Sequence, residues 1–265
     1  MEELAVLVPE HAPTDSLAQQ AYYRLRDRIV TLRLAPGSLV NERELVEQLG
    51  VGRTPVREAL HRLADDGLVE VYPRRGIYVG AVDVGDLRAI SELRIELEGF
   101  AARLAAERRT PDDQTAIAGL LAELARPTEA LPEPPGLLDG RSLEGRSLDG
   151  APSSAPSGSD GNGVPVHAAP VDAQQEHRLI HLDQRIHRLV HQAAHNPVLE
   201  SALDRAYVLA LRLWFLALGR MDPLHDAVQE HHELLAAIEA GDGARAETIA
   251  REHVAGFEQH IRQLL

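Results

Sequence analysis

Hydrophobic and polar residues along the first 80 positions alternate in a way that predicts helices followed by a β-hairpin. A helical stripe of apolar side chains runs from Leu17 to Leu32 and stops before Pro36 and Gly37. Two short apolar runs, Val69 to Tyr72 and Ile77 to Val79, flank a basic turn and predict the hairpin.

Local capping signals predict two more helices between this stripe and the hairpin. Asn41, with Glu44 three residues later, is a capping box for a short helix. Thr54 is expected to be the N-cap of the next helix, with Pro55 at its first helical position and Gly67 at its end. Three helices, a tight turn between the last two and a basic-tipped hairpin predict a winged helix-turn-helix.

Helical periodicity continues after Asp83, so every ordered segment beyond this point is expected to be helical. The predicted helices span residues 84–109, 112–125, 172–194, 198–218, 224–240 and 243–264. Short loops between the later helices imply antiparallel neighbours in a bundle. The pattern therefore predicts a mainly α protein, an N-terminal winged helix-turn-helix followed by a C-terminal antiparallel α-helical bundle.

Two segments lack this periodicity. Residues 1–15 carry four acidic residues and no Lys or Arg, and we expect a disordered acidic tail. Residues 127–170 hold eight Pro, seven Gly and six Ser, which predicts a disordered insertion at about 127–171, with an interdomain linker as the alternative. The expected domains are a DNA-binding domain at 16–80 and an effector-binding and dimerisation domain at 83–265 that contains the insertion.

Composition limits the chemistry available to the chain. The absence of cysteine excludes disulfides and thiolate metal sites, so any metal site must use His, Asp and Glu. The most apolar stretch, Tyr207 to Gly219, contains Arg212 and is too short to span a bilayer, so we expect a soluble cytoplasmic protein without membrane contact. The net charge is −14, yet residues 16–80 hold ten Arg against eight acidic residues, so the basic region coincides with the predicted winged helix.

Five arginines lie on the elements that would dock on DNA. Arg53, Thr54 and Arg57 occupy the first turn of the predicted third helix, where cations and free backbone N–H groups can meet phosphates and guanine edges. Arg43 lies near the start of the second helix, where it can contact the DNA backbone. The remaining two, Arg74 and Arg75, lie at the wing tip beside the minor groove; a solvated arginine face is the alternative.

The same region resembles the N-terminal domain of GntR-family transcriptional regulators. The resemblance rests on the run NERELVEQLGVGRTPVREAL at residues 41–60, followed by Leu63 and the Asp66-Gly67-Leu68 turn. It implies that Arg43, Arg53, Thr54, Arg57 and the wing glycine Gly76 touch operator DNA. Gly52 departs from the family pattern, in which Ser or Thr is common at this position, so a hydroxyl contact to phosphate is not expected there.

Eleven of the 13 histidines lie between residues 167 and 260, and helical geometry separates those that face a core from the others. At 100° per residue, Asp183 and His187 lie at the edge of the apolar face of their helix, and His231 and His253 share a face with apolar neighbours on the last two helices. His181, His191 and His232 are expected to point away from the core, and His260 is a reserve candidate. The four inward side chains, Asp183, His187, His231 and His253, could converge on one metal ion; hydrogen-bonded core histidines are the alternative.

This half of the chain resembles the effector domain of the FadR-type subgroup, called FCD. The residues that carry the resemblance are the run DQRIH at 183–187 with Asn196, His231 with Gly241-Asp242, His253, and the runs LRIELE at 93–98 and AARLAA at 101–106. The resemblance implies a divalent ion on Asp183, His187, His231 and His253; we expect Zn, with Ni, Mn or Fe as alternatives. Arg94 lies close to the apolar stripe of its helix and therefore needs an anionic partner, either a ligand carboxylate or Glu98 four residues later.

These observations predict a homodimeric, ligand-responsive transcription factor that binds palindromic double-stranded operator DNA in the cytoplasm, associated with the nucleoid. We expect a repressor that responds when a small carboxylate binds beside the metal and Arg94. A metal sensor, in which the ion is itself the signal, is one alternative. A metalloenzyme that activates water at the same four residues is the other, although it leaves the winged helix unexplained.

Overall fold

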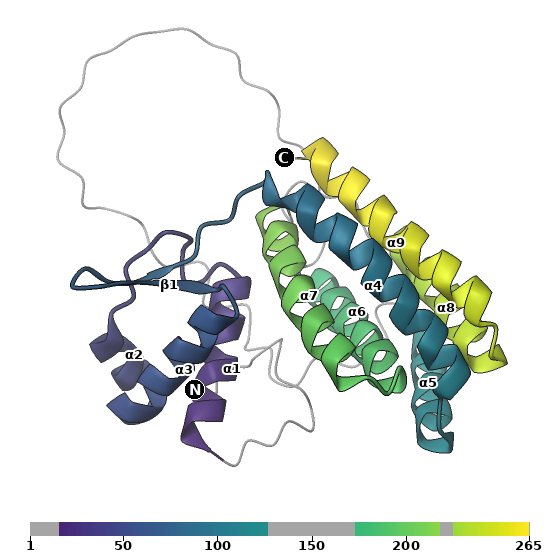
Figure 1. Cartoon of the computed structure of the whole chain (residues 1–265), viewed down its shortest axis with the longest axis horizontal. Helices are drawn as coiled ribbons and strands as arrows, with labels where there is room; N and C mark the ends of the chain where they lie inside the picture. Colours follow the sequence, from purple (N-terminus) through teal and green to yellow (C-terminus); the bar gives the residue numbers. More distant parts are fainter. Residues whose placement is uncertain (1–15, 127–172, 218–224, 265) are drawn as a thin grey trace, which may run out of the picture.

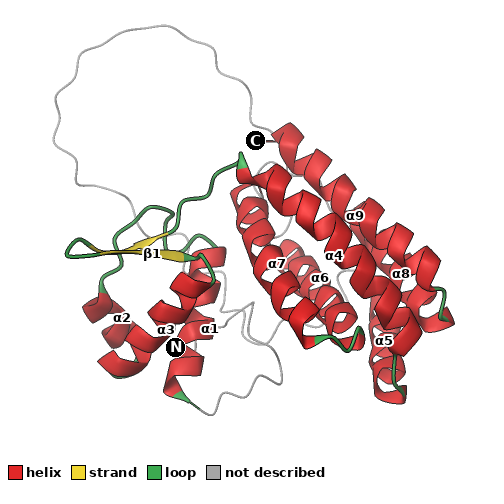
Figure 2. Ribbon diagram, in the orientation of Figure 1, coloured by secondary structure: helices red, strands yellow, loops and turns green. Residues whose placement is uncertain are grey.

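The computed structural model describes residues 16–126, 173–217 and 225–264, which form a small N-terminal domain beside a larger helical bundle (Figure 1). Figure 2 shows that the described residues are helical apart from one two-stranded sheet and the connecting loops. The elements, in chain order, are α1 (Leu17–Val30), α2 (Glu42–Leu49), α3 (Arg53–Asp65), β1 (Val69–Tyr72), β2 (Gly76–Val79), α4 (Asp86–Arg108), α5 (Pro111–Leu124), α6 (Ala173–Ala193), α7 (Pro197–Ala217), α8 (His225–Ala240) and α9 (Gly243–Leu264). The predicted winged helix-turn-helix and helical bundle are therefore confirmed.

The helix caps of the first domain agree with the sequence in one case and differ in the other. Asn41 caps α2, accepting hydrogen bonds from the backbone N–H groups of Arg43 and Glu44. The prediction of Thr54 as the cap of α3 is wrong, because Gly52 is the N-cap and the helix begins at Arg53. The backbone of Val56 bonds to the carbonyl of Gly52, so the helix starts a half-turn earlier and Thr54 lies within its first turn.

The wing is an antiparallel hairpin whose register pairs Val69 with Val79 and Tyr72 with Gly76. An isolated bridge from Leu39 to Tyr78 adds a third segment to its edge. The base of the hairpin is buried at Val69 and Val79, whereas the tip is exposed. The hairpin is thus anchored to the helices at one end and open to solvent at the other.

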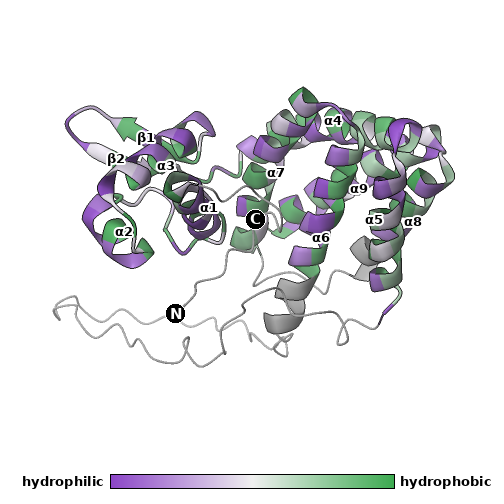
Figure 3. Cartoon of the chain, turned by 90° about the horizontal axis from the view of Figure 1, so that it is seen from below, coloured by the Kyte–Doolittle hydropathy of each residue, from purple (hydrophilic) through white to green (hydrophobic). Residues whose placement is uncertain are grey.

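The bundle is built around α4 and α9, which make the most extensive helix contact and lie side by side in Figure 1. Hydrophilic and hydrophobic segments alternate along each helix in Figure 3, as expected for amphipathic helices that pack on one face. The core between α4, α5, α6, α8 and α9 includes Ile117, Ile186, Leu235 and Ile238, all of them at most 1% exposed. Within the described residues, no helix is both long and apolar enough to cross a bilayer.

Helix α7 packs against both the winged helix and the rest of the bundle. Its residues Tyr207, Val208 and Leu211 belong to the same apolar cluster as Leu25 and Ile29 of α1. Polar contacts reinforce this packing, which brings the winged helix against the bundle. The predicted acidic tail and the predicted insertion both lie outside the described residues, so the domain limits drawn from the sequence stay predictions.

Candidate functional site

The N-terminal turn of α3 presents a polar surface on the side of the helix that faces away from the core. Arg53, Thr54 and Arg57 are exposed, whereas Val56 and Leu60 on the opposite side are at most 1% exposed. No side chain caps the first N–H groups of this helix. These free N–H groups and the two arginines therefore point into the same space, as phosphate and base contacts require.

One of these arginines has a protein partner. Nε of Arg57 donates to Oε2 of Glu42 on α2 at 2.8 Å, although the Arg57 side chain is 64% exposed. Within the described part of the chain, the guanidinium groups of Arg43 and Arg53 have no acceptor. Two of the three helix cations are thus available directly, and Arg57 can exchange a carboxylate for a base or phosphate.

The wing tip carries Arg74 and Arg75 into solvent, since both are exposed in the turn that the Arg75 N–H closes on the carbonyl of Tyr72. Gly76 follows with φ +112°, and a Cβ at this position would lie 2.8 Å from Cδ1 of Leu39. The wing therefore needs glycine here for its shape. A backbone contact of Gly76 to DNA would be an additional role.

Four side chains from three helices converge inside the bundle. Asp183 and His187 come from α6, His231 from α8 and His253 from α9, and one ligand-type atom of each lies within 4.8 Å of the others. The distance from Oδ1 of Asp183 is 3.3 Å to Nε2 of His231 and 3.7 Å to Nε2 of His187. Such separations suit atoms around one ion with bonds of about 2.1 Å. All four residues are at most 9% exposed.

The two oxygens of the Asp183 carboxylate have different partners. The hydroxyl of Tyr207 donates to Oδ2 at 2.5 Å, which leaves Oδ1 facing His187 and His231. Burial acts to raise the pKa of Asp183, but the three surrounding imidazoles and the Tyr207 hydrogen bond together bring it below its ordinary value. Asp183 is therefore an anion with one oxygen free to bind a cation.

Two histidine rings of the cluster are oriented by carboxylates. Nδ1 of His187 donates to Oε2 of Glu98 at 3.2 Å, and Nδ1 of His253 donates to Oε2 of Glu230 at 2.7 Å. Ionised carboxylates only accept hydrogen bonds, so protons lie on these Nδ1 atoms and Nε2 is the ring nitrogen left to bind a cation. Carboxylates that orient metal-ligating histidines act in this way.

His231 has a buried ring nitrogen that is not hydrogen-bonded. Its Nε2 has no hydrogen-bond partner among the described residues, although it lies 3.3 Å from the Asp183 carboxylate. Burial and the neighbouring His253 lower the pKa of His231 to about 3, so the ring is neutral, the form that binds metals. Buried polar atoms are normally paired, so this ring nitrogen fits the ligand set of a metal ion.

Glu98 of α4 is the centre of a second buried network. Its Oε1 accepts from Nη2 of Arg94 at 2.9 Å, and its Oε2 accepts from His187 and, at 2.8 Å, from Nε2 of His191. Burial opposes ionisation of Glu98, but His187, His191 and Arg94 outweigh it and hold the pKa of Glu98 well below its ordinary value. The expected outward orientation of His191 is wrong, because α4 covers that side of α6 and leaves His191 only 4% exposed.

Arg94 is buried, and its carboxylate partner is Glu98, one of the two alternatives drawn from the sequence. Its guanidinium carbon also lies 5.3 Å from the centre of the Tyr207 ring. Arg94 borders a small cavity of about 20 Å³ together with Asp183, His187 and His253. This volume suits an ion or one water molecule and is too small for an organic acid.

Comparison with known proteins assigns the two halves of the chain. Residues 17–79 match the family described as bacterial regulatory proteins, gntR family, and residues 166–256 match the FCD domain. An HTH-type transcriptional regulator of Agrobacterium vitis is 37% identical over 130 residues, which cover 49% of this chain and 74% of the relative. The chain belongs to the GntR family.

Further relatives of this GntR regulator extend over nearly its whole length. The transcriptional repressor RspR of Escherichia coli K12 is 23% identical over 252 residues, 95% of this chain and 92% of the relative. The solved structure of E. coli McbR/YncC has a TM-score of 0.68 and 23% identity, and covers 94% of this chain and 98% of that one. The GntR protein therefore shares the fold of McbR/YncC, and its two family matches make it a DNA-binding transcriptional regulator with an FCD effector domain.

Several residues of the two buried networks could not be selected from the sequence. From the sequence, Glu98 is recognisable only as the i+4 partner of Arg94. Its contacts with His187 and His191 depend on how α4 packs on α6. Tyr207 lies in an apolar run with no marker of a polar role. The structure thus brings the four predicted metal ligands together, and it adds Glu98 and Tyr207, whose hydrogen bonds to those ligands follow from helix packing.

Proposed function

We propose that this GntR protein is a homodimeric repressor of the cytoplasm and nucleoid that binds a palindromic operator and responds to a small carboxylate beside a divalent ion. One observation carries the proposal: four buried ligand-type groups meet in a domain that is tied to the winged helix, and Nε2 of His231 has no other partner. The similarity to the transcriptional repressor RspR over most of the chain supports repression.

Asp183, His187, His231 and His253 would hold the ion. One carboxylate oxygen and three neutral imidazole nitrogens suit Zn, and they also accept Ni, Mn or Fe. The ion would supply a positive centre that attracts an anionic effector. Glu98 and Glu230 fix the rings of His187 and His253, and Tyr207 holds the second oxygen of Asp183.

The effector carboxylate would be gripped by Arg94. Because only about 20 Å³ is open beside Arg94, an organic acid must displace side chains to reach it. Glu98 could keep its hydrogen bonds from His187 and His191 when Arg94 turns toward the acid. Effector binding would therefore be coupled to a rearrangement of the bundle, and a ligand shifts an equilibrium only through such differential contacts.

Helix α7 offers a physical route from this site to the DNA-binding domain. Tyr207 touches Asp183, while Asp204 and Arg212 on the same helix bond to Arg26 of α1 and to the carbonyl of Gly80 after the wing. A shift of α7 would thus reach the recognition domain at two points.

An uncovered apolar strip on α4 supports the homodimer. Leu93 and Phe100 are 50% and 36% exposed, and residues seven apart share one face of a helix. A second copy that packs on this face would remove apolar surface from water and bring two winged helices to one palindrome.

The test is operator release measured by fluorescence anisotropy on the full-length, metal-loaded protein. A panel of small mono- and dicarboxylates should contain acids that lower operator affinity at fixed metal, whereas the metal alone should not. Arg94→Lys keeps a cation for Glu98 but loses the planar fork, so it should retain metal and DNA binding and lose most of the acid response. Release by metal alone would support a metal sensor instead, and an unchanged acid response in Arg94→Lys would place the carboxylate grip elsewhere.

Glu98→Gln provides a separate check on the metal centre. An amide cannot hold both histidine rings as a carboxylate does, so metal affinity should fall about 10- to 100-fold. Competition with a chromophoric chelator measures the change. Glu96→Gln is the matched control, since this carboxylate lies on the same helix but is exposed and bonds to Arg251; equal affinities of the two variants would contradict the orienting role.

A further inference from the structure

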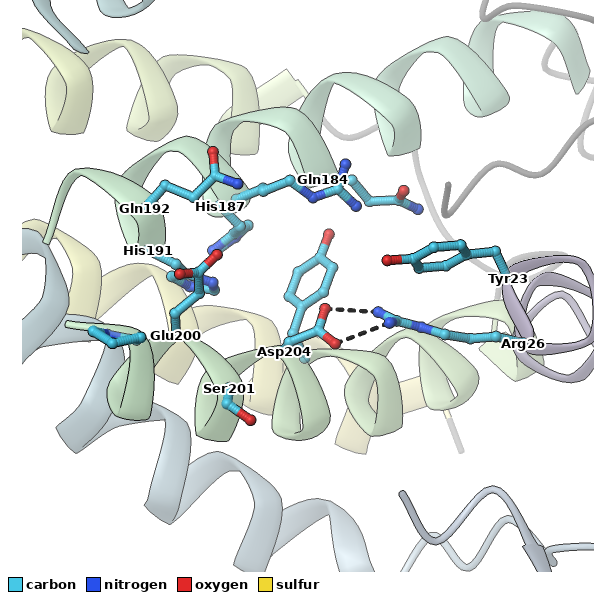
Figure 4. Close-up of a pocket in the computed structure, with 12 residues that line it drawn as sticks. Tyr23, Arg26, Gln184, His187, His191, Gln192, Glu200, Ser201 and Asp204 are labelled. Atoms are coloured by element: carbon cyan, nitrogen blue, oxygen red, sulfur yellow. Dashed lines mark hydrogen bonds and ion pairs between the residues drawn. The ribbon is translucent and has the colours of Figure 1, made fainter. Parts of the chain in front are cut away.

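A second, larger cavity lies on the other side of His187, between the winged helix and the bundle. It has a volume of about 300 Å³ and is bounded by α1, α6 and α7. This is near the lower end of the range for small-molecule sites. Figure 4 shows Tyr23 and Arg26 entering from the DNA-binding domain and Gln184 entering from the bundle.

One wall of the cavity is the ion pair that joins the two domains. Arg26 of α1 donates through Nη1 and Nη2 to the two oxygens of Asp204 on α7, at 2.9 and 2.7 Å. The Arg26 side chain is 6% exposed, whereas that of Asp204 is 45% exposed. The pair is thus bidentate and faces the cavity, as the dashed lines of Figure 4 mark.

The opposite wall carries a second guanidinium without such a partner. Arg188 of α6 lines the cavity, and among the described residues it forms no hydrogen bond or ion pair. Burial lowers the pKa of Arg188; Asp204 acts to raise it, and the like charge of Arg26 lowers it further. Two arginines and two carboxylates, Asp204 and Glu200, thus line the cavity, and among the described residues Asp204 is hydrogen-bonded to Arg26 and not to Arg188.

Gln184 adds an unsatisfied donor beside this cation. It lies four residues before Arg188, on the same face of α6, and is 3% exposed. Its buried Nε2 has no hydrogen-bond partner in the part of the chain that the structure describes. A buried N–H group without an acceptor costs free energy, and a ligand oxygen would remove that cost.

We propose that this interdomain cavity is a binding site for a small oxyanion, a carboxylate or a phosphate, held by Arg188 and Gln184. The two donors and the cavity volume support it, and it uses none of the four groups assigned to the ion except the outer side of His187. The site is separate from the Arg94 grip, which lies in the small cavity across Tyr207.

Occupancy of this site would act on the link between the domains. An anion beside Arg188 lies next to Arg26 and competes with Asp204 for its guanidinium. The bound state would then hold α1 less firmly to α7. Anion binding and operator affinity should therefore be thermodynamically coupled.

Isothermal titration calorimetry of the full-length protein tests the site with two probes, orthophosphate and succinate, with sodium chloride at equal ionic strength as the reference. At least one probe should bind saturably. Arg188→Gln should weaken that binding about tenfold or more, because it removes a charged donor. Gln184→Leu should weaken it less. Asp204→Asn should strengthen it several-fold, since it removes the competing carboxylate.

Matched variants separate this site from general effects. Arg185→Gln removes a cation on the same helix that bonds to Glu123, and it should bind the probe like wild type. His231→Ala should lose metal yet keep anion binding, so failure of the metal proposal and of this one are distinguishable. Arg188→Lys keeps the charge and should bind the probe with intermediate affinity. It provides the test if Arg188→Gln folds poorly. Saturable binding of neither probe, or wild-type affinity in Arg188→Gln, would overturn the proposal, and the probe that binds tells carboxylate from phosphate.

Discussion

Full-length protein carrying His231→Ala is expected to be isolated without a divalent ion, whereas wild type should carry about one ion per chain. The substitution deletes Nε2 of His231, a buried cluster nitrogen with no hydrogen-bond partner among the described residues. Removal of a ligand should exceed the 10- to 100-fold loss typical of an orienting group, so we expect affinity to fall by more than about 100-fold. Metal analysis after gel filtration and a chelator competition measure the change.

His232→Ala is the control, because this neighbour on α8 is exposed and turned away from the cluster. It should retain the ion. The same pair of variants can be compared in thermal melts, since an ion at 100 times its Kd stabilises the folded state by about 2.7 kcal/mol. A chelator should lower the melting temperature of wild type and His232→Ala but not that of His231→Ala. Retention of the ion by His231→Ala would remove His231 from the ligand set.

The second large effect is expected on DNA. Arg57→Ala should lose about 1 to 3 kcal/mol of specific operator binding if the guanidinium reads a base, which is about 5- to 150-fold in affinity. The ion pair with Glu42 at 2.8 Å holds Arg57 on the exposed face of α3 before DNA arrives, so the side chain is already directed away from the core. Anisotropy titrations at one salt concentration, on operator and on scrambled DNA, measure the loss and its specificity.

Arg62→Ala is the matched control for charge on α3. Arg62 is exposed on the same helix, but its guanidinium lies over the ring of Tyr22 on α1, 4.2 Å from the ring centre, away from the N-terminal turn. Its loss should leave sequence preference unchanged. Wild-type operator affinity in Arg57→Ala would contradict the assignment of α3 as the recognition helix. Arg43→Ala, by contrast, should weaken binding to both DNAs evenly by removing a phosphate contact.

The fold was predictable because local signals and periodicity agree along most of the chain. Helix bounds match the sequence-based expectation to within about two residues in the bundle, where Gly and Pro mark the ends. The four cluster residues were identified by face geometry, since a helix fixes which side chains share a side. Thr54 was misplaced because a glycine N-cap leaves no side-chain signal.

What the sequence could not supply depends on how helices pack. A helical wheel places His191 relative to its own helix, but α4 determines whether that side is covered. The pairing of Arg94 with Glu98 was one of two alternatives, and only the packing of α6 against α4 shows that the same carboxylate orients His187. No pattern in the sequence points to Arg188 and Gln184 as binding residues, because the cavity they line forms only where α1 approaches α7.

The contacts of α7 with the winged helix also constrain how such a regulator can be rebuilt. Arg26 and Gly80 lie near the two ends of the DNA-binding domain, and both bond to one helix of the effector domain. A chimera that joins this recognition domain to another effector bundle would keep its covalent connection yet lose both attachments, unless the new bundle carries counterparts of Asp204 and Arg212. Biosensors built by exchanging domains within the family would therefore need the contact surface of α7, including Asp204 and Arg212, to be transferred together with the winged helix.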